Sequence, residues 1–167
     1  HRGMTMVEII VVVAIMIILA GGMVWGMSAQ QSANVKDAAQ KTESTLEDAR
    51  MNTLAMEGPW TYRIYNDGGT CEVSILKSGS SIKTKKLGSK VTVSVDTGSG
   101  LQTLADGMAV DITFATGSGV VSSVGIGAPG AQTPVSLTAN ASARISLSGG
   151  SSTIDLTLWY LTGKITR

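Results

Sequence analysis

The most hydrophobic stretch of the chain lies near its N-terminal end and is not interrupted by charge. No acidic or basic residue occurs from Ile9 to Met27, a length close to the roughly 20 apolar residues of a membrane-spanning helix. From Ser28 to Met56 there is no proline or glycine, and small or apolar residues recur near helical spacing at Val35, Ala39, Leu46, Ala49 and Thr53. The pattern predicts one helix from about Thr5 to about Ala55, with its first half in lipid and its second half packed on a domain.

After Gly58-Pro59, which should end the helix, the pattern changes to short alternations of apolar and polar residues. Clusters typical of turns, such as Asn66–Gly69 and Asp96–Gly100, separate these alternating segments. The segments are 60–65, 71–76, 90–95, 110–115, 120–124, 143–147, 153–160 and 164–166. The predicted fold class is therefore α+β: a long N-terminal α-helix, membrane-spanning in its first half, packed on one face of an antiparallel β-sheet domain.

Two segments of the β-region allow more than one interpretation. Gly79–Gly88 contains Lys83, Lys85 and Lys86, which could form a basic patch, but a solvated loop or an edge strand protected by lysine is the better interpretation. Gly125–Pro134 is rich in glycine and proline and is predicted to be a loop that is mobile or faces a partner.

Composition and charge narrow the classes of function. The 167 residues include 13 Lys and Arg against 12 Asp and Glu, so no global charge points to nucleic acid. A single Cys and a single His exclude an intrachain disulfide, a structural zinc site and a nucleophile–histidine–acid set. We therefore expect no enzyme activity, no cofactor and no metal.

Four aspartates lie in or beside predicted turns, and two interpretations of them remain open. They could form a loose calcium site, although they lack the dense spacing of a dedicated calcium loop. Their more ordinary role is to stabilise turns. The four are Asp67, Asp96, Asp106 and Asp111.

Glu8 is the only charged residue between Gly3 and Met27. A carboxylate at the centre of a membrane helix costs roughly 2.5–3.5 kcal/mol on insertion scales, so such a charge usually has a function. The run Gly3-Met-Thr-Met-Val-Glu8, followed by uninterrupted apolar residues, resembles the N-terminus of type IV pilins and type II secretion pseudopilins. Met4 is a mild departure, because the family usually has Phe at that position.

This resemblance implies a processing site and an assembly role. Prepilin peptidase would cut between Gly3 and Met4 and methylate the new amine, so that residues 1–3 are the end of a leader. Glu8 would become the fifth mature residue and would pair with the Met4 amine of a neighbouring subunit, a buried charge pair that sets register. A plain carboxylate at the membrane interface is the alternative role for Glu8.

The resemblance also implies domains, partners and a location. Residues 4–27 would be the transmembrane half of the helix, 28–56 its amphipathic half, and 57–167 an extracytoplasmic β-rich domain. The protein would lie in the bacterial inner membrane as a single-pass protein and enter a pilus or pseudopilus. Its partners would be other pilin or pseudopilin subunits, prepilin peptidase, an inner-membrane assembly platform and membrane lipid.

Three glycines interrupt the predicted helix at Gly21, Gly22 and Gly26. Each costs about 1 kcal/mol relative to alanine in a helix interior, and the last two have the G-x-x-x-G spacing that allows close contact between helices. They are either tolerated, as glycine often is in membrane helices, or they form a soft point where the helix melts as subunits pack.

The order of elements is most similar to the minor pseudopilins of the GspH/FimT type. The shared features are Leu46–Arg50 late in the helix, Ile112–Phe114 before a glycine turn, and a closing hairpin. Members that take up DNA have a basic C-terminus, and here Lys164 and Arg167 could contact phosphates. The leading interpretation is thus a structural filament subunit, and the alternative is a minor pilin that binds DNA during natural transformation.

Overall fold

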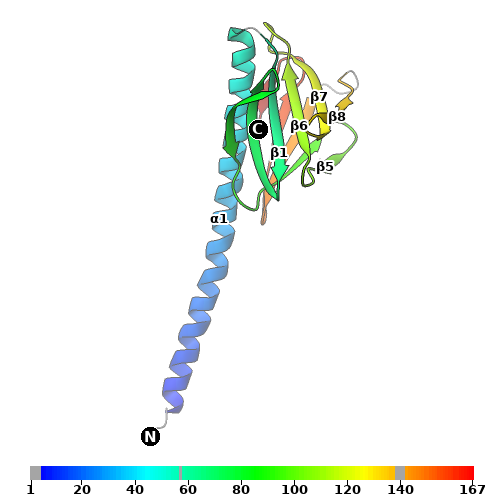
Figure 1. Cartoon of the computed structure of the whole chain (residues 1–167). Coiled ribbons are helices and arrows are strands. Elements are labelled where there is room, and N and C mark those ends of the chain that lie inside the picture. The colour runs from blue at the N-terminus through cyan, green and yellow to red at the C-terminus, as the bar shows by residue number, and fades with distance from the viewer. Residues whose placement is uncertain (1–4, 57, 138–141) are drawn as a thin grey trace.

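The structure is a computed structural model that describes residues 5–56, 58–137 and 142–167, with the side chains of 22–28 left out. A single helix, α1 (Met6–Ala55), extends for 50 residues, and its C-terminal part lies beside a β-rich domain. The N-terminal part projects away from that domain with no strand beside it (Figure 1).

Local signals set both ends of α1. Thr5 is the N-cap: its backbone is extended, with φ −76° and ψ 150°, and its side chain accepts a hydrogen bond from the Glu8 N–H. At the other end the Met56 N–H donates to the Asn52 carbonyl, and Gly58 follows with φ +108°. Gly58 and the proline after it therefore stop the helix where the sequence predicts.

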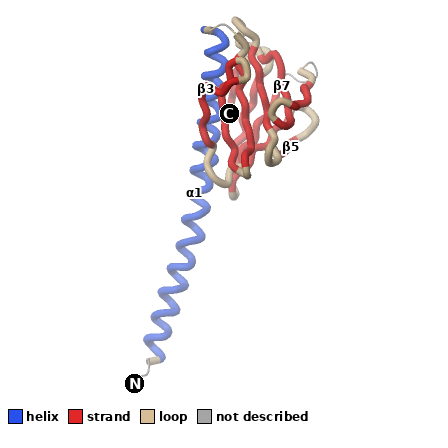
Figure 2. Tube along the Cα trace, in the orientation of Figure 1, coloured by secondary structure: helices blue, strands red, loops and turns tan. Residues whose placement is uncertain are grey.

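The β-domain contains two antiparallel sheets. The six-stranded sheet has the order β3-β2-β1-β6-β7-β8, and the five-stranded sheet has the order β11-β10-β9-β4-β5. The strands of the first sheet are β1 (Trp60–Asp67), β2 (Thr70–Lys77), β3 (Ser80–Lys86), β6 (Ala109–Phe114), β7 (Val121–Ala128) and β8 (Ala131–Val135). Those of the second are β4 (Thr92–Asp96), β5 (Leu101–Thr103), β9 (Ser142–Gly149), β10 (Ser152–Trp159) and β11 (Lys164–Thr166). Figure 2 shows how these strands stand together on one side of the helix.

The core lies between the two sheets and α1. The helix contacts β1 and β2 of one sheet and β9 and β10 of the other. Its buried stripe includes all five helix positions expected from the sequence, Val35, Ala39, Leu46, Ala49 and Thr53. Large buried side chains from both sheets meet this stripe, because alternate strand residues point to the same face. They include Tyr62, Ile64, Phe114, Leu147, Leu156 and Leu158.

The predicted fold class requires correction at its membrane-spanning half. Among the residues that the structure describes, no helix is both long enough and apolar enough to cross a membrane. The prediction of a membrane-spanning half is therefore wrong, and a single-pass location in the inner membrane is not supported.

Two details of the β-domain also differ from the prediction. The strands form two sheets rather than one, so α1 packs against the inner faces of both. Residues 125–134 are not a loop: β7 continues to Ala128, and β8 begins at Ala131 after a two-residue turn at Pro129 and Gly130. Glycine and proline hid this hairpin, because both are typical of loops but are also accepted in edge strands and close strand packing.

Candidate functional site

The N-terminal part of α1 exposes apolar side chains all round the helix. Every described residue from Thr5 to Gly21 is exposed, and the exposed fraction of the large apolar side chains ranges from 40% at Val12 to 84% at Met6. These side chains are Met6, Val7, Ile9, Ile10, Val11, Val12, Val13, Ile15, Met16, Ile17, Ile18 and Leu19. Contiguous apolar surface of this kind marks an interaction site rather than a solvated face.

Glu8 lies in the first turn of this apolar helix. Its N–H donates to Thr5 Oγ1 at 3.4 Å and to the Thr5 carbonyl at 3.1 Å. A threonine at the N-cap followed by a glutamate three residues later is the capping-box sequence, and a carboxylate is favourable near the positive end of the helix dipole. The sequence interpretation of Glu8 missed this local role, although the spacing from Thr5 to Glu8 carries the signal.

The structure says less about the predicted cleavage site and about the three glycines of the helix. Gly3 and Met4 lie outside the described residues. The helix is continuous through Gly21, Gly22 and Gly26, and a Cβ added at Gly21 would meet nothing within 4 Å. The soft point therefore stays a prediction.

The lysines of β3 pair with α1 and β2. Lys83 Nζ lies 2.8 Å from Asp48 Oδ2, and Lys85 Nζ donates to Ser44 Oγ at 3.2 Å. Lys86 Nζ lies 3.4 Å from Glu72 Oε1. The segment is an edge strand whose lysines have acidic or hydroxyl partners, which confirms the edge-strand interpretation and weakens that of a free basic patch.

The C-terminal cations lie on β11, one of the two edge strands of the five-stranded sheet, and just beyond it. Lys164 stands opposite Trp159 of β10, and both Lys164 and Arg167 are exposed. Two exposed cations offer few contacts to phosphates, and one half-exposed indole offers little surface on which bases could stack. This part of the surface therefore gives weak support for nucleic-acid binding.

Two of the four predicted acidic turn residues, Asp96 and Asp106, accept hydrogen bonds from backbone N–H groups. Asp96 Oδ1 accepts hydrogen bonds from the N–H groups of Gly98 and Gly100, and Asp106 Oδ1 accepts one from Gly68. No group of three or more His, Cys, Asp or Glu residues in the described parts of the chain is placed to hold a metal ion. These bonds confirm the turn interpretation for Asp96 and Asp106.

Asp111 is different, because it lies within β6 and accepts from three donors. Arg63 on the neighbouring strand β1 donates from Nε and one terminal nitrogen to the two carboxylate oxygens, each at 2.6 Å. Gln132 of β8 reaches across β7 and donates to Asp111 Oδ2 at 2.8 Å. The two bonds to Asp111 raise the pKa of Arg63 above its ordinary value. This network ties β1, β6 and β8 together on the outer face of the six-stranded sheet.

A cleft is lined by residues of both sheets, at the edges formed by β5 and β8. Both of these strands lie on the side of the domain away from α1 (Figure 1). The volume of the cleft is about 520 Å³, within the usual range for ligand sites. It is lined by Thr97, Gly98, Ser99, Gln102, Met108, Ile126, Thr133, Pro134, Val135 and Ser136. Sequence reasoning missed this cleft, because part of its lining comes from β5 and β8, two short strands that were not predicted.

Comparisons with models of known families, with curated proteins and with solved structures found no match.

Proposed function

We propose that the protein is a structural subunit that assembles through the N-terminal part of α1 into a filament of the pilin or pseudopilin kind. The observation that carries this proposal is the exposed apolar surface of the helix from Met6 to Leu19. A helix that is apolar all round is normally buried in a larger assembly, because such a surface is unfavourable in water.

The occupant of this surface is the same helix of other copies. The β-domain lies beside the C-terminal part of α1 (Figure 1), so copies can bring their projecting helices together while their β-domains remain outside the bundle. The G-x-x-x-G spacing of Gly22 and Gly26 favours close approach of such helices. Burial of an aliphatic side chain contributes about 1.5–3 kcal/mol, so one helix surrounded by others is strongly stabilised.

Glu8 and the cut between Gly3 and Met4 belong to the same proposal. Cleavage by prepilin peptidase would create an amine at Met4, and the carboxylate of Glu8 in one copy would neutralise the amine of the next. A charge pair inside an apolar bundle selects one register, because any other register leaves both charges buried and unpaired. This role is additional to the capping position of Glu8.

The proposal is tested by identifying the first residue of the protein after its expression in cells. Mass spectrometry of the full chain, expressed with a prepilin peptidase, should find a product that begins at N-methylated Met4. Gly3→Ala is predicted to be less processed, and Thr116→Ala, an exposed turn substitution, should be processed normally. A Gly3–Met4 bond that stays intact in the unmodified chain would overturn the processing part of the proposal.

A further inference from the structure

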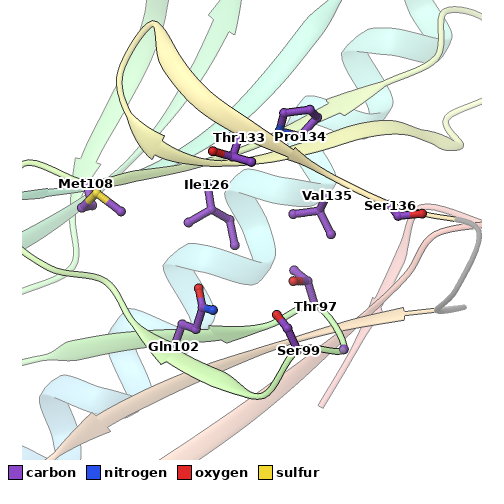
Figure 3. A pocket seen from close by; sticks show the side chains of 10 residues that line it. Thr97, Ser99, Gln102, Met108, Ile126, Thr133, Pro134, Val135 and Ser136 are labelled. Carbon is purple, nitrogen blue, oxygen red and sulfur yellow. The ribbon is translucent and has the colours of Figure 1, made fainter.

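The two sheets leave a gap on the side of the domain away from α1. β5 is the last strand of one sheet and β8 is the last strand of the other. Figure 3 shows Ile126, Thr133 and Val135 on one wall and Gln102 and Ser99 on the other, with their side chains directed into the same space. The cleft is therefore a place where the inner faces of both sheets reach solvent.

The chemistry of the lining selects the kind of ligand. The apolar part consists of Met108, Ile126 and Val135, which also pack against the core. The rest consists of hydroxyl groups, the Gln102 amide, Pro134 and the Gly98 backbone, and none of the lining residues is charged or aromatic. A charged ligand would lose its hydration without gaining a partner, and a nucleobase would find no stacking platform.

The two edges of the cleft differ in their capacity to pair with another strand. β8 contains Pro134, which has no N–H to donate, and proline at a sheet edge opposes the addition of a strand. β5 contains no proline, its three residues are exposed, and Leu101 is 57% exposed. An added strand would therefore pair with β5 rather than with β8.

We propose that the cleft binds an uncharged, extended segment of a partner protein, which adds to the free edge of β5 as a sixth strand of that sheet. Its backbone would pair with Leu101–Thr103, and every second side chain would contact Ile126 and Val135. The remaining side chains would lie near the hydroxyl groups of the rim. This inference does not depend on the proposed assembly of α1, because β5 and β8 lie away from the projecting part of the helix (Figure 1).

A synthetic peptide of alternating character tests the proposal directly. The probe is acetyl-Thr-Val-Thr-Val-Thr-amide, and two control peptides carry proline at the central position or lysine in place of both valines. Hydrogen exchange of the full chain in detergent, read by mass spectrometry, should slow about tenfold in the segment 97–104 with the probe. Neither control peptide should produce this protection.

Two matched variants locate the binding. Thr133 lines the cleft from β8 and is exposed, so Thr133→Lys introduces a charge there without filling the core. Thr92 is an exposed strand threonine that does not line the cleft. Thr133→Lys should weaken probe binding at least tenfold, and Thr92→Lys should leave it unchanged.

Three results would overturn the proposal. The first is no protection of residues 97–104 by the alternating peptide at millimolar concentration. The second is equal protection by the proline peptide, which would mean that side chains alone are recognised, as for a small neutral molecule. The third is unchanged binding in Thr133→Lys, which would place the peptide elsewhere.

Discussion

The N–H of Glu8 donates to the hydroxyl oxygen of Thr5 at 3.4 Å, so the first carboxylate of α1 lies where a helix N-terminus is most receptive to negative charge. Replacing an N-cap threonine with alanine costs about 0.5–2 kcal/mol. Thr5→Ala should therefore speed amide hydrogen exchange at Glu8 and in the next turn by about 2- to 30-fold. Thr5→Ser, which keeps the hydroxyl, should exchange like the unmodified chain. If Thr5→Ala exchanges as slowly as the unmodified chain, the N-cap does not stabilise the first turn of α1.

Arg63 and Asp111 provide a second prediction, because their paired hydrogen bonds link β1 to β6. The side chains are only 22% and 16% exposed, and hydrogen bonds to charged groups contribute about 1.5–3 kcal/mol. Asp111→Ala should lower the free energy of unfolding, measured by denaturant titration, by about that amount.

The control for this pair is Lys86→Ala. Lys86 lies 3.4 Å from Glu72 and its side chain is 76% exposed, so solvent screens the interaction and the loss should not exceed about 0.5 kcal/mol. If Asp111→Ala and Lys86→Ala destabilise equally, the Arg63–Asp111 pair is no stronger than a surface contact.

The hydroxyl of Tyr62 is buried without a hydrogen-bond partner among the described residues. Burial raises the pKa of Tyr62 far above its ordinary value. The Thr42 hydroxyl lies close enough to offset part of the shift but does not form a hydrogen bond of good geometry with Tyr62. Above about pH 10 the unfolded chain loses the Tyr62 proton while the folded chain keeps it, so stability should fall as pH rises through this range.

Tyr62→Phe should remove both the unsatisfied hydroxyl and its contribution to the loss of stability at high pH. The free energy of unfolding at pH 7 should stay equal or rise by about 1 kcal/mol, because an unsatisfied buried hydroxyl is removed, and the decline above pH 10 should become less steep. Thermal unfolding at pH 7 and pH 11 measures both. A loss of more than about 1 kcal/mol at pH 7 would mean that Tyr62 has a hydrogen bond in solution.

Gly163 lies at a point where the β10–β11 turn meets the β6–β7 turn and α1. Its φ is +62°, and an added Cβ would collide with the Gly119 carbonyl oxygen and the Arg50 side chain. Gly68 has a similar φ of +56° with nothing within 4 Å of an added Cβ. Gly163→Ala should therefore destabilise the fold by about 1–3 kcal/mol more than Gly68→Ala. If the two substitutions lower the thermal unfolding temperature equally, the positive φ alone accounts for the destabilisation and the collision adds nothing.

The sequence predicts most elements because their signals are local. The end of α1 at Ala55 follows from Gly58 and Pro59, and the buried helix stripe follows from spacing. β5 has only three residues, too short for alternation to be visible. β8 contains a proline and follows a Pro-Gly turn, so its composition is that of a loop.

The partition into two sheets and the β5–β8 cleft could not be predicted, because they depend on which strands become edges after folding. The role of Asp111 could not be predicted either. Arg63 and Asp111 are 48 residues apart in the sequence, and only the register of β1 with β6 brings them opposite each other. The capping relationship of Thr5 to Glu8 was available in the sequence, since it needs only a spacing of three.

The central claim is that the exposed apolar part of α1 is covered by the same helix of other copies. A photo-reactive amino acid at Ile10 or Met16, both exposed on α1, should give a ladder of crosslinked multimers in cells, whereas the same group at Thr92 on the β-domain should give less. Glu8→Gln should shorten the ladder while the first turn of α1 keeps its hydrogen-exchange protection. A chain that remains monomeric after crosslinking at Ile10 and Met16 would contradict the claim.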